Sequence, residues 1–245
     1  MNAGDAVNAV ATASPLDAGT AVPDAGDRAA APAGPLTVGF DLDMTLIDSR
    51  PGIKAVYDRL AEETGVFIDS ALAVTRLGPP LDEELAHWFP AERVPAMADR
   101  YRELYGDHAI APTPAMPGAL AAMDAVRRAG GRSLVVTAKH GPNARLHLDH
   151  VGIDAELCGS LWAEAKAEAL VEWGASVYVG DHVGDVRGAR RAGAVSVAVA
   201  TGPCTAEELR AAGADVVLAD LTEFPGWLAA HTAAHAGART AAHAG

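Results

Sequence analysis

The sequence predicts an α/β protein in which a parallel sheet carries helices on both faces and a small helical domain is inserted after the first strand. From residue 118 on, short apolar runs alternate with helical stretches of about ten residues. Such alternation implies right-handed crossovers and a parallel sheet. Strand-like runs are largely missing from 50 to 110, although an apolar, β-prone run ends at Phe40. This helical stretch is the predicted insertion.

The first half of the chain holds one predicted strand, which is followed by helices. Residues 36–40 are mostly apolar, as a strand buried on both faces should be. A helix over 52–64 follows Asp48–Pro51, which offers an N-cap and a proline at a first helical position. Further helical stretches, separated by the breakers Gly78–Pro80 and Phe89–Pro90, are predicted at 70–77, 81–89 and 91–107.

The second half alternates between the two kinds of element. Gly130 and Gly131 end the first of its helices, and each later apolar run is short enough for a strand. We expect strands at 133–137, 155–159, 176–179, 195–200 and 215–218. We expect helices at 118–129, 141–151, 162–173, 183–192 and 206–212.

Composition excludes several classes of protein. The 245 residues carry a formal net charge of −13, which argues against nucleic acid or an anionic membrane as the main partner. No apolar run approaches the roughly 20 residues of a membrane span. The two cysteines, Cys158 and Cys204, form neither a disulfide framework nor a zinc-binding spacing. An enzyme that collects an anionic substrate with a few local cations fits this charge best.

The ends of the chain are poor material for a core. Residues 1–34 are mostly Ala, Gly, Asp, Pro and Val, which predicts a disordered leader. This leader lacks the charged start and apolar core of a signal peptide, so we predict a cytoplasmic protein. Residues 231–245 repeat Thr-Ala-Ala-His-Ala-Gly and predict a low-complexity tail, solvated and disordered, whose histidines bind no metal. The core domain is then 35–50 with 111–230, and the insertion is 51–110.

Two carboxylates stand at the end of the first predicted strand. Asp41 and Asp43 lie two residues apart within VGFDLDMTLID, residues 38–48. Side chains on a strand alternate between faces, so both carboxylates leave the sheet in similar directions near its C-terminal edge. Open α/β sheets bind ligands at that edge. One aspartate there would suit a strand terminator, whereas two followed by Thr45 indicate a site.

Three further fragments follow in order. They are the run Ser133–Thr137 ending in a hydroxyl, Lys166 within a helical stretch, and the Gly-Asp-x-x-x-Asp of Asp181 and Asp185. Asp-x-Asp-x-Thr, Thr, Lys and this last acidic pair, in that order, resemble the haloacid dehalogenase-like hydrolases over roughly residues 36–230. More narrowly, they resemble the phosphoglycolate phosphatase-like branch. The resemblance implies a Rossmann-like core, and it identifies the helical insertion as the cap of that family.

The resemblance also implies roles for these residues. Asp41 would attack phosphorus to form an aspartyl-phosphate, and Asp43 would act as acid and then base. Lys166 would hold Asp41 and the phosphate together, and the Thr137 hydroxyl with backbone N–H groups from Ala138 onward would bind the phosphate oxygens. Mg²⁺ prefers hard oxygen ligands. Its implied ligands are the carboxylates of Asp41 and Asp181 and the backbone carbonyl of Asp43, with Asp185 close by.

Substrate selection is predicted to come from the cap. Arg76 is the cap cation that we select for a substrate carboxylate or second phosphate, and an ordinary surface pair with a neighbouring acid explains this arginine equally well. Arg50 and Lys54 are further candidates. His182 is assigned a spectator or specificity role, and His140 and His147 are assigned to the surface. Departures from the family pattern are Met44 in place of a frequent Gly, Ala138 in place of Asn, and no proline after Lys166. The change at Ala138 weakens the case for phosphoglycolate itself.

Several readings stay open beside the expected Mg²⁺-dependent phosphatase of a small phosphorylated metabolite. Each motif residue alone has a structural explanation, and Asp181 or Asp185 could simply cap the following helix. A sugar phosphomutase or pyrophosphatase of the same family would use the same groups, and so would a catalytically silent binding protein derived from it. A phospho-receiver module places its nucleophile on a middle strand, which does not fit Asp41. The sequence leaves the oligomeric state open.

Overall fold

Six parallel strands form the central sheet of the computed structural model, which describes residues 35–242. The strands lie in the order β3-β2-β1-β4-β5-β6, so that β1 is central and the chain fills first one side of it and then the other. Their bounds are β1 (Thr37–Phe40), β2 (Arg132–Val136), β3 (Glu156–Cys158), β4 (Val177–Gly180), β5 (Val195–Val199) and β6 (Val216–Leu218). The predicted parallel α/β fold is confirmed; the predicted leader, 1–34, lies outside the described residues.

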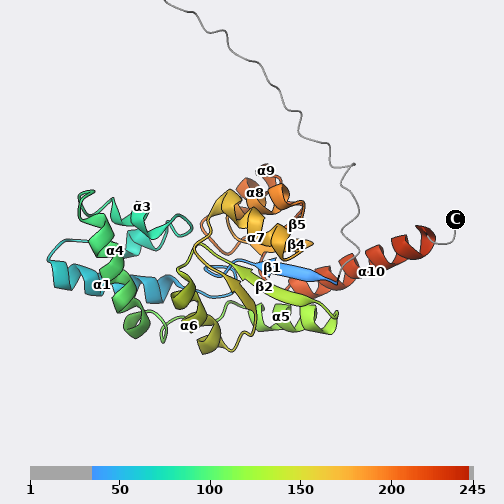
Figure 1. The fold of residues 1–245 in the computed structure, drawn as a ribbon, viewed down its shortest axis with the longest axis horizontal. Coiled ribbons are helices and arrows are strands. Elements are labelled where there is room, and N and C mark those ends of the chain that lie inside the picture. Colours follow the sequence, from blue (N-terminus) through green and yellow to red (C-terminus); the bar gives the residue numbers. More distant parts are fainter. Residues whose placement is uncertain (1–34, 243–245) are drawn as a thin grey trace, which may run out of the picture. The chain divides into compact units, whose positions relative to one another are not determined.

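Helices cover both faces of this sheet (Figure 1). Val38 and Phe40 of β1 point to one face, where they pack in a cluster with α5 (Ala119–Arg128), α6 (Gly141–Val151) and α10 (Phe224–Ala242). Leu134 and Val136 of β2 point to the opposite face, where α7 and α8 pack. On that face lie η1 (Ala163–Ala165), α7 (Lys166–Glu172), α8 (Val183–Ala192) and α9 (Ala206–Ala211).

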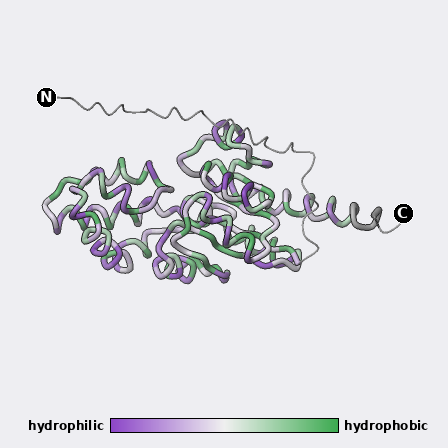
Figure 2. Tube along the Cα trace, turned by 45° about the horizontal axis from the view of Figure 1, so that its top comes forward, coloured by the Kyte–Doolittle hydropathy of each residue, from purple (hydrophilic) through white to green (hydrophobic). Residues whose placement is uncertain are grey.

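The central strands are buried along their whole length. All four residues of β1 and all four of β4 are buried, as expected for parallel strands with helices on both sides. Figure 2 colours the chain by hydropathy, and hydrophobic and hydrophilic stretches alternate along it. Burial at this level leaves the strand ends, rather than the strand faces, as the place where polar groups reach a ligand.

Four helices between β1 and α5 form the helical insertion, called the cap below. They are α1 (Arg50–Thr64), α2 (Ser70–Ala73), α3 (Leu81–Leu85) and α4 (Val94–His108). The cap has an apolar cluster of its own, in which Val56 and Leu60 of α1 pack with Leu85 and Leu104. The predicted helical insertion is therefore observed, although α2 and α3 are each shorter than the sequence predicts.

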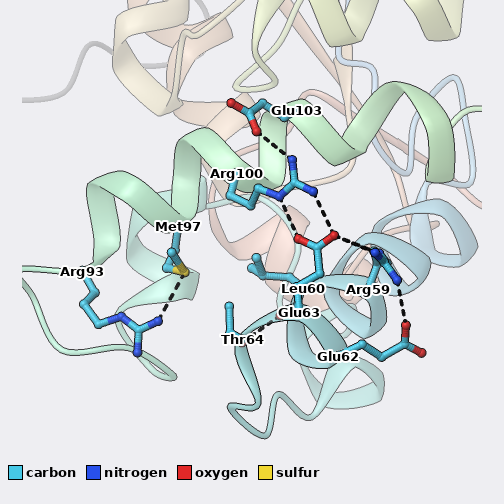
Figure 3. A network of polar contacts seen from close by, with 9 residues as sticks. All are labelled: Arg59, Leu60, Glu62, Glu63, Thr64, Arg93, Met97, Arg100 and Glu103. Atoms are coloured by element: carbon cyan, nitrogen blue, oxygen red, sulfur yellow. Dashed lines mark hydrogen bonds and ion pairs between the residues drawn. The ribbon is translucent and has the colours of Figure 1, made fainter.

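Charged side chains join α1 and α4 on the cap surface (Figure 3). Arg100 of α4 donates through Nε to Glu63 of α1 at 2.7 Å and through Nη1 to Glu103 at 2.8 Å. Arg59 also pairs with Glu63, at 2.8 Å. The cap is thus held by an apolar interior and by ion pairs on its outside.

The two connections between cap and core run next to each other. The Asp48 N–H donates to the Pro114 carbonyl, and the Met116 N–H donates to the Leu46 carbonyl, both at 2.9 Å. Between them, Ile47 and Ala115 form an antiparallel bridge. The chain therefore enters and leaves the cap through one short two-stranded ribbon, formed by residues 46–48 and 114–116. The first of these segments follows closely after Asp43.

The C-terminal segment differs from the prediction. Residues 231–242, expected to be disordered, continue α10, which runs from Phe224 to Ala242. Alanine is the strongest helix former, and residues 231–242 contain one glycine, Gly237, and no proline, so an established helix extends into them. His231 stacks on Trp227 with ring centroids 4.9 Å apart, and His235 Nδ1 lies 2.8 Å from the His231 carbonyl oxygen.

Within the described part of the chain, no helix is both long enough and apolar enough to cross a membrane.

Candidate active site

Three carboxylates converge where β1 and β4 end. The Asp41 N–H donates to the Val179 carbonyl at 2.8 Å, which fixes Asp41 as the residue that continues β1 past the edge of the sheet. Asp181 and Asp185 follow β4, its neighbour. One carboxylate oxygen from each of the three aspartates lies within 4.8 Å of the other two, and all three residues are buried. Adjacent parallel strands thus bring together residues that are 140 positions apart.

A tight turn after Asp41 positions Asp43. The Leu46 N–H donates to the Leu42 carbonyl at 2.9 Å, and the Met44 N–H donates to the Ile47 carbonyl at 2.8 Å. Met44 has a φ of 57°, a left-handed conformation that costs a residue with a Cβ about 1 kcal/mol and glycine almost nothing. The turn therefore explains why glycine suits position 44 and shows that methionine is accommodated there at a small cost.

Thr45 ties this turn to the second acidic motif. Its Oγ1 donates to Asp181 Oδ1 at 2.9 Å, within a buried setting. Gly202, in the loop after β5, approaches the same side chain so closely that an added Cβ would lie 1.7 Å from Asp181 Oδ2. The position of the Asp181 carboxylate is therefore fixed from two sides.

Lys166 lies beneath the carboxylates and is fully buried. Its Nζ is 2.6 Å from Asp185 Oδ1 and 3.0 Å from Asp41 Oδ1, and it donates to the Tyr178 hydroxyl at 3.0 Å. Burial acts to lower the pKa of Lys166, but the Asp185 and Asp41 carboxylates outweigh it and raise the pKa above its ordinary value. The ammonium is therefore permanently charged and bridges two of the three aspartates.

The start of α8 shows how the structural and the chemical explanations of the acidic pair combine. His182, not Asp181, is the N-cap, since its Nδ1 accepts the Gly184 N–H at 3.0 Å. Asp185 Oδ2 accepts the His182 N–H at 3.1 Å, while its other oxygen binds Lys166. Asp185 is a capping residue and a site residue at once, and Asp181 caps nothing.

The charge of this cluster is not balanced. Burial, together with the Asp185 and Asp43 carboxylates, raises the pKa of Asp41 to about 7 in spite of Lys166. Burial and the Asp185 and Asp41 carboxylates raise the pKa of Asp181 well above its usual range. Asp41 Oδ1 is buried without a hydrogen bond, although Lys166 is near. Three clustered carboxylates beside a single ammonium fit a hard divalent ion such as Mg²⁺.

Asp43 belongs to a separate buried network that joins core and cap. Lys139 Nζ lies 2.9 Å from Asp43 Oδ1 and donates to the hydroxyl of Tyr105, in cap helix α4, at 2.5 Å. The Tyr105 hydroxyl in turn lies 2.9 Å from His147 Nε2, in core helix α6. Burial acts to raise the pKa of Asp43, yet the Lys139 ammonium and hydrogen bonds hold it below its ordinary value. Asp43 is therefore an ion-paired carboxylate here.

The prediction of a surface position for His147 is wrong. The residue is fully buried, and burial together with the Lys139 charge lowers the pKa of His147 to about 4, so the ring is neutral. The Tyr105 oxygen accepts from Lys139, so its own proton is available to His147 Nε2 in the tautomer in which that nitrogen is unprotonated. His140, by contrast, is exposed as predicted.

Thr137 and Ala138 present polar groups at the end of β2. The Thr137 hydroxyl oxygen accepts the Lys139 N–H at 3.1 Å, which leaves the hydroxyl proton available. Within residues 35–242, no acceptor is found for that proton or for the Ala138 N–H. Both groups line the same cavity as Asp41 and Asp43, so they can donate to an anion bound there.

The cavity has a volume of about 290 Å³ and lies between the strand ends and the cap. Six of the eight residues predicted for the site line it, whereas Lys166 and Asp185 lie behind Asp41. Arg76 lines it too, but forms an ion pair with Glu84. Arg50 and Lys54 are not among its lining residues and pair with Asp48 and Asp58. Sequence reasoning did not predict Tyr105 for the site and placed His147 on the surface, and the signal for Lys139 was its position two residues after Thr137.

Sequence comparison decides the family. A sequence profile described as haloacid dehalogenase-like hydrolase matches residues 38–190, more than half of the chain. A second profile, described as HAD-hydrolase-like, matches residues 160–224. The chain belongs to the haloacid dehalogenase-like hydrolases. The predicted resemblance to this family and to its phosphoglycolate phosphatase-like branch is confirmed, as is the prediction of a phosphatase enzyme.

Individual relatives of this hydrolase fit the same assignment. It is 28% identical over 219 residues to a phosphoglycolate phosphatase from Caulobacter vibrioides, which covers 77% of this chain and 89% of the relative. It is 32% identical over 191 residues to tyrosine-protein kinase PtkA from Mycobacterium tuberculosis, covering 71% of this chain and 66% of that protein. A haloacid dehalogenase-like hydrolase structure from Streptococcus pneumoniae aligns with a TM-score of 0.70 at 21% identity, over 79% of this chain and 98% of that one.

Proposed function

We propose that this hydrolase is a Mg²⁺-dependent phosphatase that cleaves a small phosphate monoester through an aspartyl-phosphate on Asp41. The observation that carries the proposal is the position of Asp41, a carboxylate at the end of the central strand that lines the cavity and has Lys166 at 3.0 Å behind it. A carboxylate so placed can meet a phosphorus atom directly, and its neighbours supply the remaining groups that the reaction needs.

In the first half-reaction, a carboxylate oxygen of Asp41 attacks phosphorus and the bond from phosphorus to the ester oxygen breaks. The electron pair of that bond goes to the ester oxygen, which takes a proton from the Asp43 carboxyl group and leaves as an alcohol. The Thr137 hydroxyl and the Ala138 N–H donate to the phosphate oxygens, and Lys166 keeps Asp41 aligned. An incoming phosphate adds negative charge beside Asp43, which favours the protonated carboxyl despite the Lys139 contact.

In the second half-reaction, the Asp43 carboxylate accepts a proton from water, whose oxygen attacks phosphorus. The bond from phosphorus to the Asp41 oxygen breaks, so that inorganic phosphate leaves and both aspartates return to their starting forms. The ion pair with Lys139 stabilises the carboxylate form of Asp43, which is the form that this step needs.

The metal would be held by Asp41, Asp181 and the Asp43 backbone carbonyl, with Asp185 close by. The oxygens of the three clustered carboxylates lie within 4.8 Å of one another, and this donor set suits a hard cation. When bound, Mg²⁺ neutralises part of the negative charge that otherwise keeps a phosphate dianion away from Asp41.

Other readings of the same site remain alternatives. A phosphomutase or pyrophosphatase would share the attack by Asp41. One relative is named as a tyrosine-protein kinase, a name that describes phosphate transfer to a protein. A silent binding protein is less well supported, because the groups that the reaction needs all lie at this one edge of the sheet. The cytoplasmic location stays a prediction.

The test measures phosphate release from a panel of small phosphate monoesters and pyrophosphate, with Mg²⁺ and after chelation by EDTA. We expect release from a monoester that chelation abolishes and Mg²⁺ restores, and acid quenching during turnover should trap phosphate covalently on Asp41. Asp41→Asn should abolish both results. The exposed Asp154 offers a matched control, since Asp154→Asn removes the same charge as Asp41→Asn and should keep both results. Metal-independent release, or release without any trapped phosphoenzyme, would contradict the mechanism.

A further inference from the structure

Apolar and aromatic side chains form much of the cavity wall. Tyr57 and Tyr101 pack against each other with ring centroids 5.0 Å apart. Neither hydroxyl has a hydrogen-bond partner within the described residues. The apolar lining comes mainly from the cap, with one core residue, and includes Ile53, Tyr57, Leu77, Pro80, Tyr101 and Trp162. Such walls favour a carbon skeleton over a charged group.

Arg76 is a cap cation that lines the same cavity, but its guanidinium is paired with Glu84. Its Nη2 donates to Glu84 Oε1 at 2.6 Å, and its Nε donates to Glu84 Oε2 at 3.0 Å, which is a bidentate pair. The Trp88 indole N–H donates to Glu84 Oε1 at 3.0 Å and so holds the carboxylate in place. The side chain of Glu84 is only 13% exposed, so water screens this pair weakly.

The remaining cations that line the cavity also have carboxylate partners, although the pairs of Arg102 are more exposed to solvent. Arg102 lies 3.1 Å from Asp99 and 3.6 Å from Asp82, and Lys139 is paired with Asp43. Every Lys and Arg that lines the cavity, within the described residues, therefore has a carboxylate partner. Asp82 and Glu84 line the cavity themselves, so a second anionic group of a substrate would meet carboxylates without a free cation to offset them.

We propose that the substrate is a phosphate monoester with an uncharged alcohol part that has an apolar ring or chain, and that a second anionic group weakens its use. Phosphoglycolate, which carries a carboxylate two bonds from the ester oxygen, is then a poor substrate. This inference rests on the proposed phosphatase function and names the substrate class for the same site. The pairing of Arg76 with Glu84 carries this inference, because Arg76 is the residue that the sequence offers as a receptor for a substrate carboxylate.

The first experiment compares kcat/KM for three esters under identical Mg²⁺ concentrations. Phosphoglycolate and 2-hydroxyethyl phosphate have nearly the same size and differ in whether the far end is a carboxylate or an alcohol, while benzyl phosphate adds an apolar ring. We expect benzyl phosphate to be used best and phosphoglycolate at least about tenfold less well than 2-hydroxyethyl phosphate. Phosphoglycolate as the best of the three, or benzyl phosphate no better than 2-hydroxyethyl phosphate, overturns the inference. No release from any ester instead contradicts the proposed function.

The second experiment frees Arg76. Glu84→Gln removes one negative charge and retains an oxygen that can accept the Trp88 indole N–H. We expect the ratio of kcat/KM for phosphoglycolate to that for 2-hydroxyethyl phosphate to rise about tenfold, and the additional change Arg76→Gln to reverse the rise. The exposed neighbour Glu83 provides the control, since Glu83→Gln should leave the ratio unchanged. A folded Glu84→Gln variant with an unchanged ratio overturns the role of the Arg76 pair.

Discussion

The edge of the sheet and the surface of the cap use charged residues in opposite ways. At the edge, Asp41, Asp181, Asp185 and Lys166 are buried and their charges do not balance. On the cap, the Arg and Glu side chains of α1 and α4 form pairs of opposite charge that are open to solvent (Figure 3). Exposed pairs of this kind contribute little to stability, whereas buried unmatched charges decrease it.

The difference separates residues that are present for chemistry from residues that are present for solubility and packing. An acidic cluster that raises the pKa of Asp41 to about 7 through burial and neighbouring carboxylates is destabilising in the free protein, and it becomes useful only with a cation and a phosphate. The cap network needs neither. Variants in the two regions should therefore separate activity from stability.

The largest expected effect comes from Asp41→Asn. Asparagine cannot form the phosphoenzyme, so we expect kcat to fall by at least about a thousandfold. The carboxyl pKa is higher in the folded protein than in the unfolded chain, so its ionisation at pH 8 costs stability that Asn does not lose. We expect the metal-free variant to be more stable by about 1–2 kcal/mol, measured by urea unfolding at pH 8. A variant that loses activity because it is less stable than the wild type would contradict this separation.

The next effect concerns the pH dependence of stability through buried His147. The folded protein lowers the pKa of His147 to about 4 by burial, while the unfolded chain has the ordinary pKa near 6.5. Between these values the unfolded chain binds more protons, so stability is complete above about pH 6.5 and decreases as the pH falls toward 4. Relative to His147→Gln, the wild type should lose about 2 kcal/mol between pH 7 and pH 5.

Urea unfolding of both proteins at several pH values checks this expectation. The difference between the two proteins isolates His147 from the carboxyl groups that titrate in the same range. Parallel curves of unfolding free energy against pH would show that His147 is as free to take up a proton in the folded protein as in the unfolded chain.

A smaller effect on kcat is expected from Tyr105, a buried cap residue that contacts the sheet edge through Lys139. Tyr105→Phe removes the hydroxyl that accepts from Lys139 and donates to His147, and so loosens the lysine that pairs with Asp43. We expect kcat to fall about tenfold with a smaller change in KM. Tyr57→Phe removes a hydroxyl from the same cavity without breaking this network, and should have less effect on kcat. Equal losses of kcat in the two variants would assign Tyr105 to substrate binding instead.

The smallest effect is expected on the cap surface. Arg100→Ala breaks the pairs with Glu63 and Glu103 while its side chain is 41% exposed. We expect the thermal midpoint to fall by no more than about 2 °C and kcat/KM to stay the same. Salt at 0.5 M, which screens such pairs, should reduce even this difference between variant and wild type. A large drop in the midpoint would mean that surface ion pairs, rather than the apolar interior, hold the cap together.

The sequence predicted the part of the site that depends on strand ends. Asp41, Asp181 and Asp185 meet because they follow β1 and β4, and neighbouring parallel strands end at one edge. The network of Lys139, Tyr105 and His147 could not be predicted, since its members come from a loop, a cap helix and a core helix that meet only through packing. For the same reason, the sequence left open whether Arg76 binds substrate or pairs with a neighbouring acid, and the structure pairs it with Glu84, eight residues on.

The short ribbon that connects cap and core has a consequence for how such a protein can be rebuilt. Because the Asp48 N–H and the Pro114 carbonyl are hydrogen-bonded to each other, the inserted segment begins and ends at almost the same point. A cassette with adjoining ends can be removed, or exchanged for another of different length, with little change in loop-closure entropy and without moving the strand ends. The inserted segment is therefore a cassette in the backbone, and a segment grafted at Asp48 and Pro114 would have to replace the Tyr105 hydroxyl, which contacts the Lys139 that pairs with Asp43.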